Sequence, residues 1–145
     1  MIFRNCAGGI VFYANRVFIL KNEKNEWVLP KGKIRNGELP DDVALSRVKL
    51  EGGVDAEILS DVGGTSYEFY SISRKQPVCN EIQWYIMRAD SKEYEINEEL
   101  QFKDGGFFPI EEALEKITYS QDKSIVNVSY KKFKDLMRSK SLATV

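Results

Sequence analysis

The chain has 145 residues, of which 43% are hydrophobic and 30% are charged, and its formal net charge is -1. This length and composition are typical of one globular domain with a single core, and they exclude an intrinsically disordered chain. The near-zero charge argues against nucleic acid as a partner. The apolar runs are far shorter than the ~20 residues that cross a membrane, so no membrane partner is expected either.

The sequence contains no histidine and only two cysteines, Cys6 and Cys79. This excludes nucleophile arrangements that need histidine, as well as zinc sites built from histidine or from four thiolates. Any metal would be a hard cation such as Mg²⁺, held by oxygen ligands. The N-terminal residues lack the layout of a signal peptide, and two cysteines in apolar contexts do not indicate a disulfide framework. We therefore expect a cytoplasmic protein.

The first half of the chain alternates strand-like patterns with turns. The Gly8-Gly9 pair inside the first pattern predicts a bulge or a close approach to the backbone by a neighbouring strand or a ligand. Pro30 ends a short apolar run, and Pro40 suits the first turn of a helix that Gly52-Gly53 terminates. The expected elements are strands at 5–13, 16–21 and 27–29, and a helix at 40–51.

The second half predicts more strands, a short helix and a final amphipathic helix. In that last helix, Ile125, Val128, Phe133 and Leu136 are expected to face the core. Strands mixed with one internal and one C-terminal helix indicate an α/β fold, an α/β/α sandwich with a mixed sheet between the two helices, as a single domain over residues 1–145. The expected elements are strands at 54–62, 65–72, 79–89 and 107–108, a loop at 73–77, a turn at 104–106, and helices that begin at Pro109 and span 120–137.

Residues 32–54 read GKIRNGELPDDVALSRVKLEGGV. This segment resembles the Nudix box, in which a glycine, five residues, a glutamate and seven residues precede Arg-Glu-apolar-x-Glu-Glu-x-Gly-apolar. The segments AGGIVF, WVLPKG, IQWYIM, FFPIEEAL and ITYSQDKSIV are similar, in order, to the family branch that cleaves dinucleoside polyphosphates and diphosphoinositol phosphates. The resemblance covers nearly the whole chain and implies the Nudix fold. The box positions that match are Gly32, Glu38, Val48, Glu51, Gly53 and Val54.

Three box positions depart from the family pattern: Ser46 stands at the arginine, and Arg47 and Leu50 stand at two of the glutamates. The resemblance implies that these glutamates hold divalent metal, with a backbone carbonyl from Gly32. With only Glu51 left, we expect a nucleotide or polyphosphate binder with little or no hydrolysis and no cofactor. The alternatives are an active Mg²⁺-dependent pyrophosphohydrolase that uses Glu51 with other carboxylates, or a protein-interaction scaffold.

Arg47 and Glu51 allow two interpretations, because residues four apart share one face of a helix. They form either an exposed ion pair or a phosphate site, in which Arg47 replaces the metal and Glu51 orients it. Glu38 pairs with the box arginine in the family, so here we expect it to pair with Arg47 or Lys33, or to face solvent.

The resemblance also implies roles outside the box. Arg4, Lys31 and Lys75 are expected to bind phosphates together with Arg47, and Glu98 or Glu99 is expected to supply a further catalytic carboxylate. Tyr70 and Tyr119 could stack on a base, although a half-buried core role is the commoner one for such residues. The expected partner is a small nucleotide or polyphosphate, and a homodimer is an open alternative.

Overall fold

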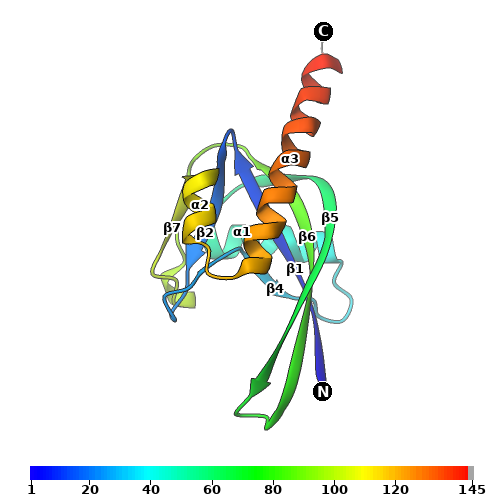
Figure 1. Ribbon diagram of the computed structural model, residues 1–145, viewed down its shortest axis with the longest axis vertical. Helices are drawn as coiled ribbons and strands as arrows, with labels where there is room; N and C mark the ends of the chain where they lie inside the picture. The colour runs from blue at the N-terminus through cyan, green and yellow to red at the C-terminus, as the bar shows by residue number, and fades with distance from the viewer. Residues whose placement is uncertain (144–145) are drawn as a thin grey trace.

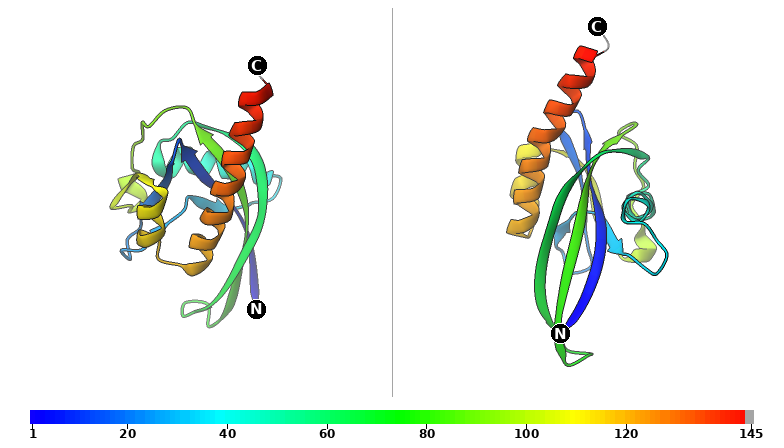
Figure 2. Two further views of the ribbon diagram at one scale, coloured as in Figure 1. Left: turned by 45° about the horizontal axis from the view of Figure 1, so that its top comes forward. Right: turned by 90° about the vertical axis from the view of Figure 1, so that its right-hand side faces the viewer.

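The computed structural model describes the backbone of residues 1–143 and the burial of side chains as far as Lys140. A 7-stranded mixed sheet lies between α1 on one face and α2 and α3 on the other (Figures 1 and 2). This confirms the α/β sandwich that the sequence predicts. The elements are β1 (Ile2–Tyr13), β2 (Arg16–Lys21), β3 (Trp27–Val28), β4 (Lys31–Lys33), α1 (Pro40–Gly52), β5 (Ala56–Ser71), β6 (Gln76–Ala89), η1 (Glu98–Leu100), β7 (Asp104–Pro109), α2 (Ile110–Lys116) and α3 (Ser120–Ala143).

The strand order is β3-β2-β1-β6-β5, with β7 paired to β2 and β4 paired to β1. β1 and β6 run parallel along almost their whole length, whereas the other pairs are antiparallel. On the side away from β6, β1 pairs with two different strands along its length. Gly8 is opposite Lys31 of β4, and Phe12 is opposite Val17 of β2.

Alternate residues of each strand point to opposite faces, so the sheet has a core on each side. Ile10, Phe12 and Trp84 are fully buried on the face that α2 and α3 cover. Ala7 and Val11 are fully buried on the face that α1 covers. None of the helices in the described part of the chain is long and apolar enough to cross a membrane.

Helix α1 has the ends that the sequence predicts. Pro40 occupies the first turn after Leu39, whose side chain makes no capping hydrogen bond. Gly53 follows the helix with a φ of 63°, and its N–H donates to the Lys49 carbonyl at 2.8 Å. Glycine adopts this left-handed conformation without a steric penalty, which fixes where α1 ends.

Several strands are longer than predicted. β1 begins at Ile2, and β5 is continuous through Gly63 and Gly64, because register shifts absorb the extra residues there while pairing with β6 continues. β6 begins at Gln76, which shortens the predicted loop to residues 72–75. β4, which no pattern predicted, forms only through its pairing with β1.

The last elements also differ from the prediction. β7 begins at Asp104, where a turn was expected. The strand packs so closely against Ile96 that only glycine fits at position 105, since a Cβ there would lie 2.5 Å from Ile96 Cδ1. α3 extends to Ala143. The prediction that Val128 faces the core is wrong, because its side chain is exposed. Val126 is fully buried instead.

The Gly8-Gly9 pair marks a close approach rather than a bulge. A Cβ on Gly8 would lie 2.5 Å from Trp84 Cζ3 and 2.6 Å from the Pro30 carbonyl oxygen. We expect Gly8→Ala to lower the free energy of unfolding by about 1–3 kcal/mol, because packed backbone would have to separate. Urea denaturation measures this change. Ser66→Ala, at an exposed position of β5, should stay within about 0.5 kcal/mol of the parent protein. Parent-like stability of Gly8→Ala would contradict the close approach.

Candidate functional site

The junction of β4 and α1 brings three box residues together. Gly32 lies on β4, while Arg47 and Glu51 lie one turn apart on α1. The Arg47 stem crosses directly over Gly32, since a Cβ on that glycine would come within 2.4 Å of Arg47 Cδ. Only glycine fits beneath this arginine without displacing it.

Arg47 holds Glu51 with two of its nitrogens. The distance from Nε to Glu51 Oε2 is 2.8 Å, and Nη2 lies 2.6 Å from the same oxygen. The Glu51 side chain is 4% exposed and the Arg47 side chain is 32% exposed. The interpretation as an exposed surface ion pair is therefore wrong for Glu51, whereas Arg47 remains accessible to a ligand.

Burial raises the pKa of the Glu51 carboxyl above its ordinary value. The charge and hydrogen bonds of Arg47 oppose this rise, as do the charge and backbone hydrogen bond of Lys31. A buried carboxylate is costly unless it is paired and hydrogen-bonded. Arg47 and Lys31 are therefore the groups that keep an ionised Glu51 inside the fold.

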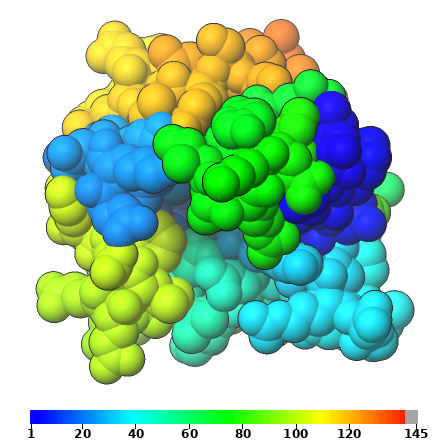
Figure 3. Space-filling model, turned by 90° about the horizontal axis from the view of Figure 1, so that it is seen from below, coloured from blue at the N-terminus to red at the C-terminus, as the bar shows by residue number. Residues whose placement is uncertain are grey.

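Lys31 lies on β4, next to Gly32. Its positive charge lowers the pKa of acidic groups on four different segments, although for three of them burial outweighs this effect. Seen from below, the surface is hollowed between the β5–β6 hairpin, the β2–β3 loop and the segment before β7 (Figure 3). The groups on which Lys31 acts are Cys6 of β1, Glu26 of the β2–β3 loop, Glu51 of α1 and Asp122 of α3.

Tyr119 borders this site and is 47% exposed, so the half-buried core role is wrong for it. Its hydroxyl donates to Glu26, which raises the pKa of Tyr119 to about 12. Its ring lies nearly parallel to that of Tyr67, with centroids 6.4 Å apart and planes at 14°. The Tyr67 hydroxyl accepts a hydrogen bond of 2.8 Å from Asn80 Nδ2. The predictions from the sequence missed Tyr67. The one signal for it is the alternation in β5, which puts Tyr67 on the same face of the sheet as Thr65.

The sheet register aligns Arg4 with Tyr67, because Arg4 is opposite Asn80 and Asn80 is opposite Tyr67. Arg4 is half-buried, and its charge also acts on the Cys6 thiol. One row across β1, β6 and β5 thus joins a cation, an amide and an aromatic ring.

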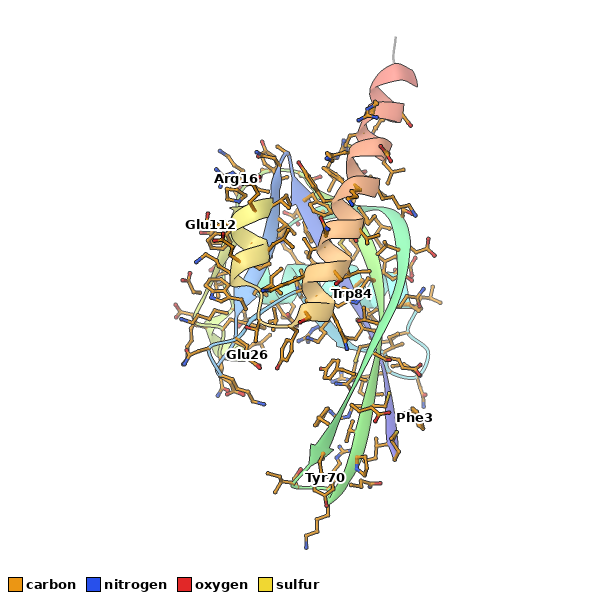
Figure 4. The ribbon with its side chains drawn as sticks, in the orientation of Figure 1. Phe3, Arg16, Glu26, Tyr70, Trp84 and Glu112 are labelled. Atoms are coloured by element: carbon orange, nitrogen blue, oxygen red, sulfur yellow. The ribbon has the colours of Figure 1, made fainter. Side chains whose placement is uncertain are left out.

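Tyr70 and Lys75 lie elsewhere, at the end of the β5–β6 hairpin (Figure 4). Tyr70 is opposite Pro77, and the next residue of β6, Val78, is opposite Ile2 of β1. Ile2 is six residues along β1 from Gly8, which corresponds to about 20 Å at 3.3 Å per residue. Tyr70 is 62% exposed, so a core role is wrong for it as well. The structure does not bring this tyrosine or the turn residue Lys75 to the β4–α1 junction.

Glu38 binds neither of the expected cations: its Oε1 accepts from the Arg35 backbone N–H at 2.8 Å. Glu98 begins η1 and is exposed. The preceding Asn97 ties this segment to the end of α1, since its N–H donates to the Glu51 carbonyl at 3.0 Å. Ser46 and Leu50 are exposed on α1. Within the described residues, no group of three or more acidic or cysteine side chains is arranged to hold a metal ion.

Comparison with known proteins gives one family. The NUDIX domain model matches residues 1–128. The mutator protein MutT4 of Mycobacterium tuberculosis is 28% identical over 103 residues, which make up 71% of this chain but only 40% of that protein. An RNA pyrophosphohydrolase of Sulfurovum sp. is 33% identical, with 77% of this chain and 74% of that protein covered.

Solved structures show the same fold at low sequence identity. A NUDIX hydrolase from Nitrosomonas europaea has a TM-score of 0.68 at 15% identity and covers 87% of this chain and 69% of its own. An Ap4A hydrolase of C. elegans, in a binary complex, has a TM-score of 0.66 at 15% identity, with 91% and 98% covered. These structures therefore share the fold described above.

Burial raises the pKa of the Asp122 carboxyl, and the charge of Lys31 only partly opposes this. The folded protein therefore binds the proton more tightly than the unfolded chain, and the stability gained at acid pH is lost as pH rises through the folded pKa. We expect Asp122→Asn to raise the melting temperature relative to the parent protein by an amount that grows from pH 4 to pH 7.5. Scanning calorimetry at both values measures it. Asp135→Asn removes an exposed charge from the same helix and is the control. A difference that is constant or shrinks with pH would contradict the prediction.

Proposed function

Because the chain belongs to the NUDIX domain family, we propose that it binds a nucleotide or polyphosphate at the β4–α1 junction and hydrolyses it little or not at all. The observation that carries this proposal is the position of Arg47, whose stem packs across Gly32 and whose guanidinium is hydrogen-bonded to the buried Glu51. The resemblance to the Nudix box implies a metal-binding glutamate at this position.

The charge of the box face supports weak hydrolysis. Three glutamates would give this face a formal charge of -3, whereas Arg47, Leu50 and Glu51 together give zero. Hydrolysis of a diphosphate linkage in such sites relies on Mg²⁺ to neutralise charge and activate water. Arg47 repels a cation, Leu50 offers no oxygen, and Glu51 Oε2 is already bonded to Arg47. The residues present do not fit Mg²⁺, so we assign no step to a metal ion.

The same change favours anion binding without metal. A guanidinium binds phosphate oxygens through parallel N–H bonds, and Glu51 fixes its orientation. Lys31 adds a second positive charge beside it, and Arg4 adds a third farther along β1. Tyr119, parallel to Tyr67, offers a ring on which a base can stack.

An active pyrophosphohydrolase is the second candidate, favoured by the 33% identity to a protein named RNA pyrophosphohydrolase. It would require Glu51 to leave Arg47 and to hold Mg²⁺ together with Glu38 and either Glu98 or Glu99. Titration of the protein with Mg²⁺ separates the two functions. A protein-interaction scaffold, in contrast, would bind neither Mg²⁺ nor polyphosphate.

If Arg47 binds phosphate, tripolyphosphate should bind in the presence of EDTA, and added Mg²⁺ should weaken binding slightly by competing for the anion. Arg47→Ala should lose roughly 1.5–3 kcal/mol of binding free energy, and Arg47→Lys should recover only part of it. Calorimetry measures both. Lys49→Ala is the matched control, because Lys49 is on the same helix and pairs with Asp55 at 2.9 Å. Equal affinity of Arg47→Ala and Lys49→Ala would overturn the role of Arg47.

Restoring the box should restore metal binding. We expect the triple variant Ser46→Arg, Arg47→Glu, Leu50→Glu to bind Mg²⁺ and to cleave diphosphate linkages at least ~10³-fold faster than the parent protein, since metal charge stabilisation contributes several kcal/mol. Mg²⁺ calorimetry and phosphate release measure this. Adding Glu51→Gln should abolish the gain; turnover that persists indicates a contaminant. Robust Mg²⁺-dependent turnover by the parent protein, sensitive to Glu51→Gln, would sink the proposal.

A further inference from the structure

A cavity of about 700 Å³ lies at the opposite end of β1 from the box. The β1–β2 turn, the end of β6 and the C-terminal half of α3 line it on the open surface, at the end of the molecule where α3 ends (Figure 1). Tyr13 on its wall is five residues along β1 from Gly8, which pairs with Lys31; this is about 17 Å at 3.3 Å per residue. The cavity is therefore separate from the site proposed above.

The wall of this cavity carries more positive than negative charge. Arg88, Lys134 and Arg138 line it, and Asp90 is the acidic residue among the lining side chains of the described chain. Arg88 pairs with Glu57, and Lys140 Nζ lies 3.9 Å from the same carboxylate. The group formed by Arg88, Lys140 and Glu57 therefore has a net formal charge of +1.

The other two cations are available to a ligand. Lys134 Nζ lies 4.8 Å from the centre of the Tyr130 ring, and none of the ion pairs within the described residues includes it. Arg138 meets Asp135 only at 3.7 Å, with both side chains more than 70% exposed. Exposed pairs of this kind contribute little and are easily exchanged for a bound anion.

The remaining walls are aromatic and apolar. Phe133 is buried and stacks on Phe12 with ring centroids 4.8 Å apart, which makes this side of the cavity rigid. Tyr130, tilted against the same Phe12, and Met137 are half-buried beside it. Aromatic rings and a thioether favour a flat ring as their partner. A cavity of this volume is large enough for a small organic ligand.

We propose that this cavity is a second binding site, which takes a small aromatic anion independently of the box site. The ring of the ligand packs against Tyr130, Phe133 and Met137, and its anionic group is bound by Lys134 and Arg138. Binding requires both parts: the cations alone face water, and the apolar wall alone does not select for charge.

The probe is 8-anilinonaphthalene-1-sulfonate, an aromatic sulfonate whose fluorescence rises on burial, and N-phenyl-1-naphthylamine is its counterpart without the sulfonate. The folded protein should bind the sulfonate at one saturable site, and Lys134→Glu should weaken it roughly tenfold, since one favourable charge contact becomes repulsive. Lys131→Glu is the matched control, because it makes the same charge change at an exposed position of α3 outside the cavity. Arg138→Glu tests the second cation.

The result that supports the site is saturable binding that Lys134→Glu and Arg138→Glu both weaken and Lys131→Glu does not, with weaker binding of the uncharged counterpart. Tripolyphosphate at saturation should leave the sulfonate bound. The proposal is overturned by any of three results: no saturable binding, an equal effect of the two lysine variants, or displacement of the probe by tripolyphosphate. Parent-like circular dichroism of each variant excludes unfolding as the cause.

Discussion

The close approach of residues 30–32 to β1 is the constraint on which the site depends. The Gly9 N–H donates to the Pro30 carbonyl at 3.1 Å, and Gly8 leaves no space for a Cβ between Trp84 and that carbonyl. This contact places Lys31 in antiparallel pairing with Gly8. The following glycine then presents a bare backbone to α1, which lets Arg47 lie across it. Gly9 and Gly32 thus decide how closely the box helix meets the sheet, because a Cβ on Gly9 would lie 2.6 Å from Val48 Cγ2 of α1.

The hydrogen-bonding capacity of Arg47 explains how one side chain can serve both the fold and a ligand. A guanidinium has five N–H donors. Glu51 Oε2 accepts a hydrogen bond from Nε and lies 2.6 Å from Nη2, and these contacts leave the Nη1 donors for phosphate oxygens. Removal of Arg47 would leave a buried carboxylate without its main partner, a loss that is strongly destabilising in protein interiors. Its exchange for lysine would keep the charge but lose the fork geometry. A ligand on Arg47 would therefore add to the ion pair with Glu51 rather than compete with it.

The sequence predicts the fold because its signals are local. The apolar runs of β1 and β2, the proline and glycine at the ends of α1, and the order of the family segments all follow from neighbouring residues. The site is harder to predict because it is made by register. β4 has three residues and exists only through pairing with β1. The row that joins Arg4, Asn80 and Tyr67 depends on the parallel pairing of β1 with β6, which no local pattern contains. Tyr70 was a candidate for base stacking, yet alternation in β5 turns it to the other face of the sheet from Tyr67.

The charge of the box face also determines what a polyphosphate would need in order to bind there. A face with three carboxylates repels an anion, so the anion binds only together with divalent cations that bridge the two. A face whose net formal charge is zero, with Lys31 beside it, attracts the anion directly. The cation then comes from the fold itself and is fixed in orientation before the ligand arrives, so less side-chain entropy is lost on binding. An arginine held in this way cannot lower the pKa of a bound water as a metal ion does. Under the proposed function, the substitution that lets an anion bind without metal would therefore be the same one that weakens hydrolysis.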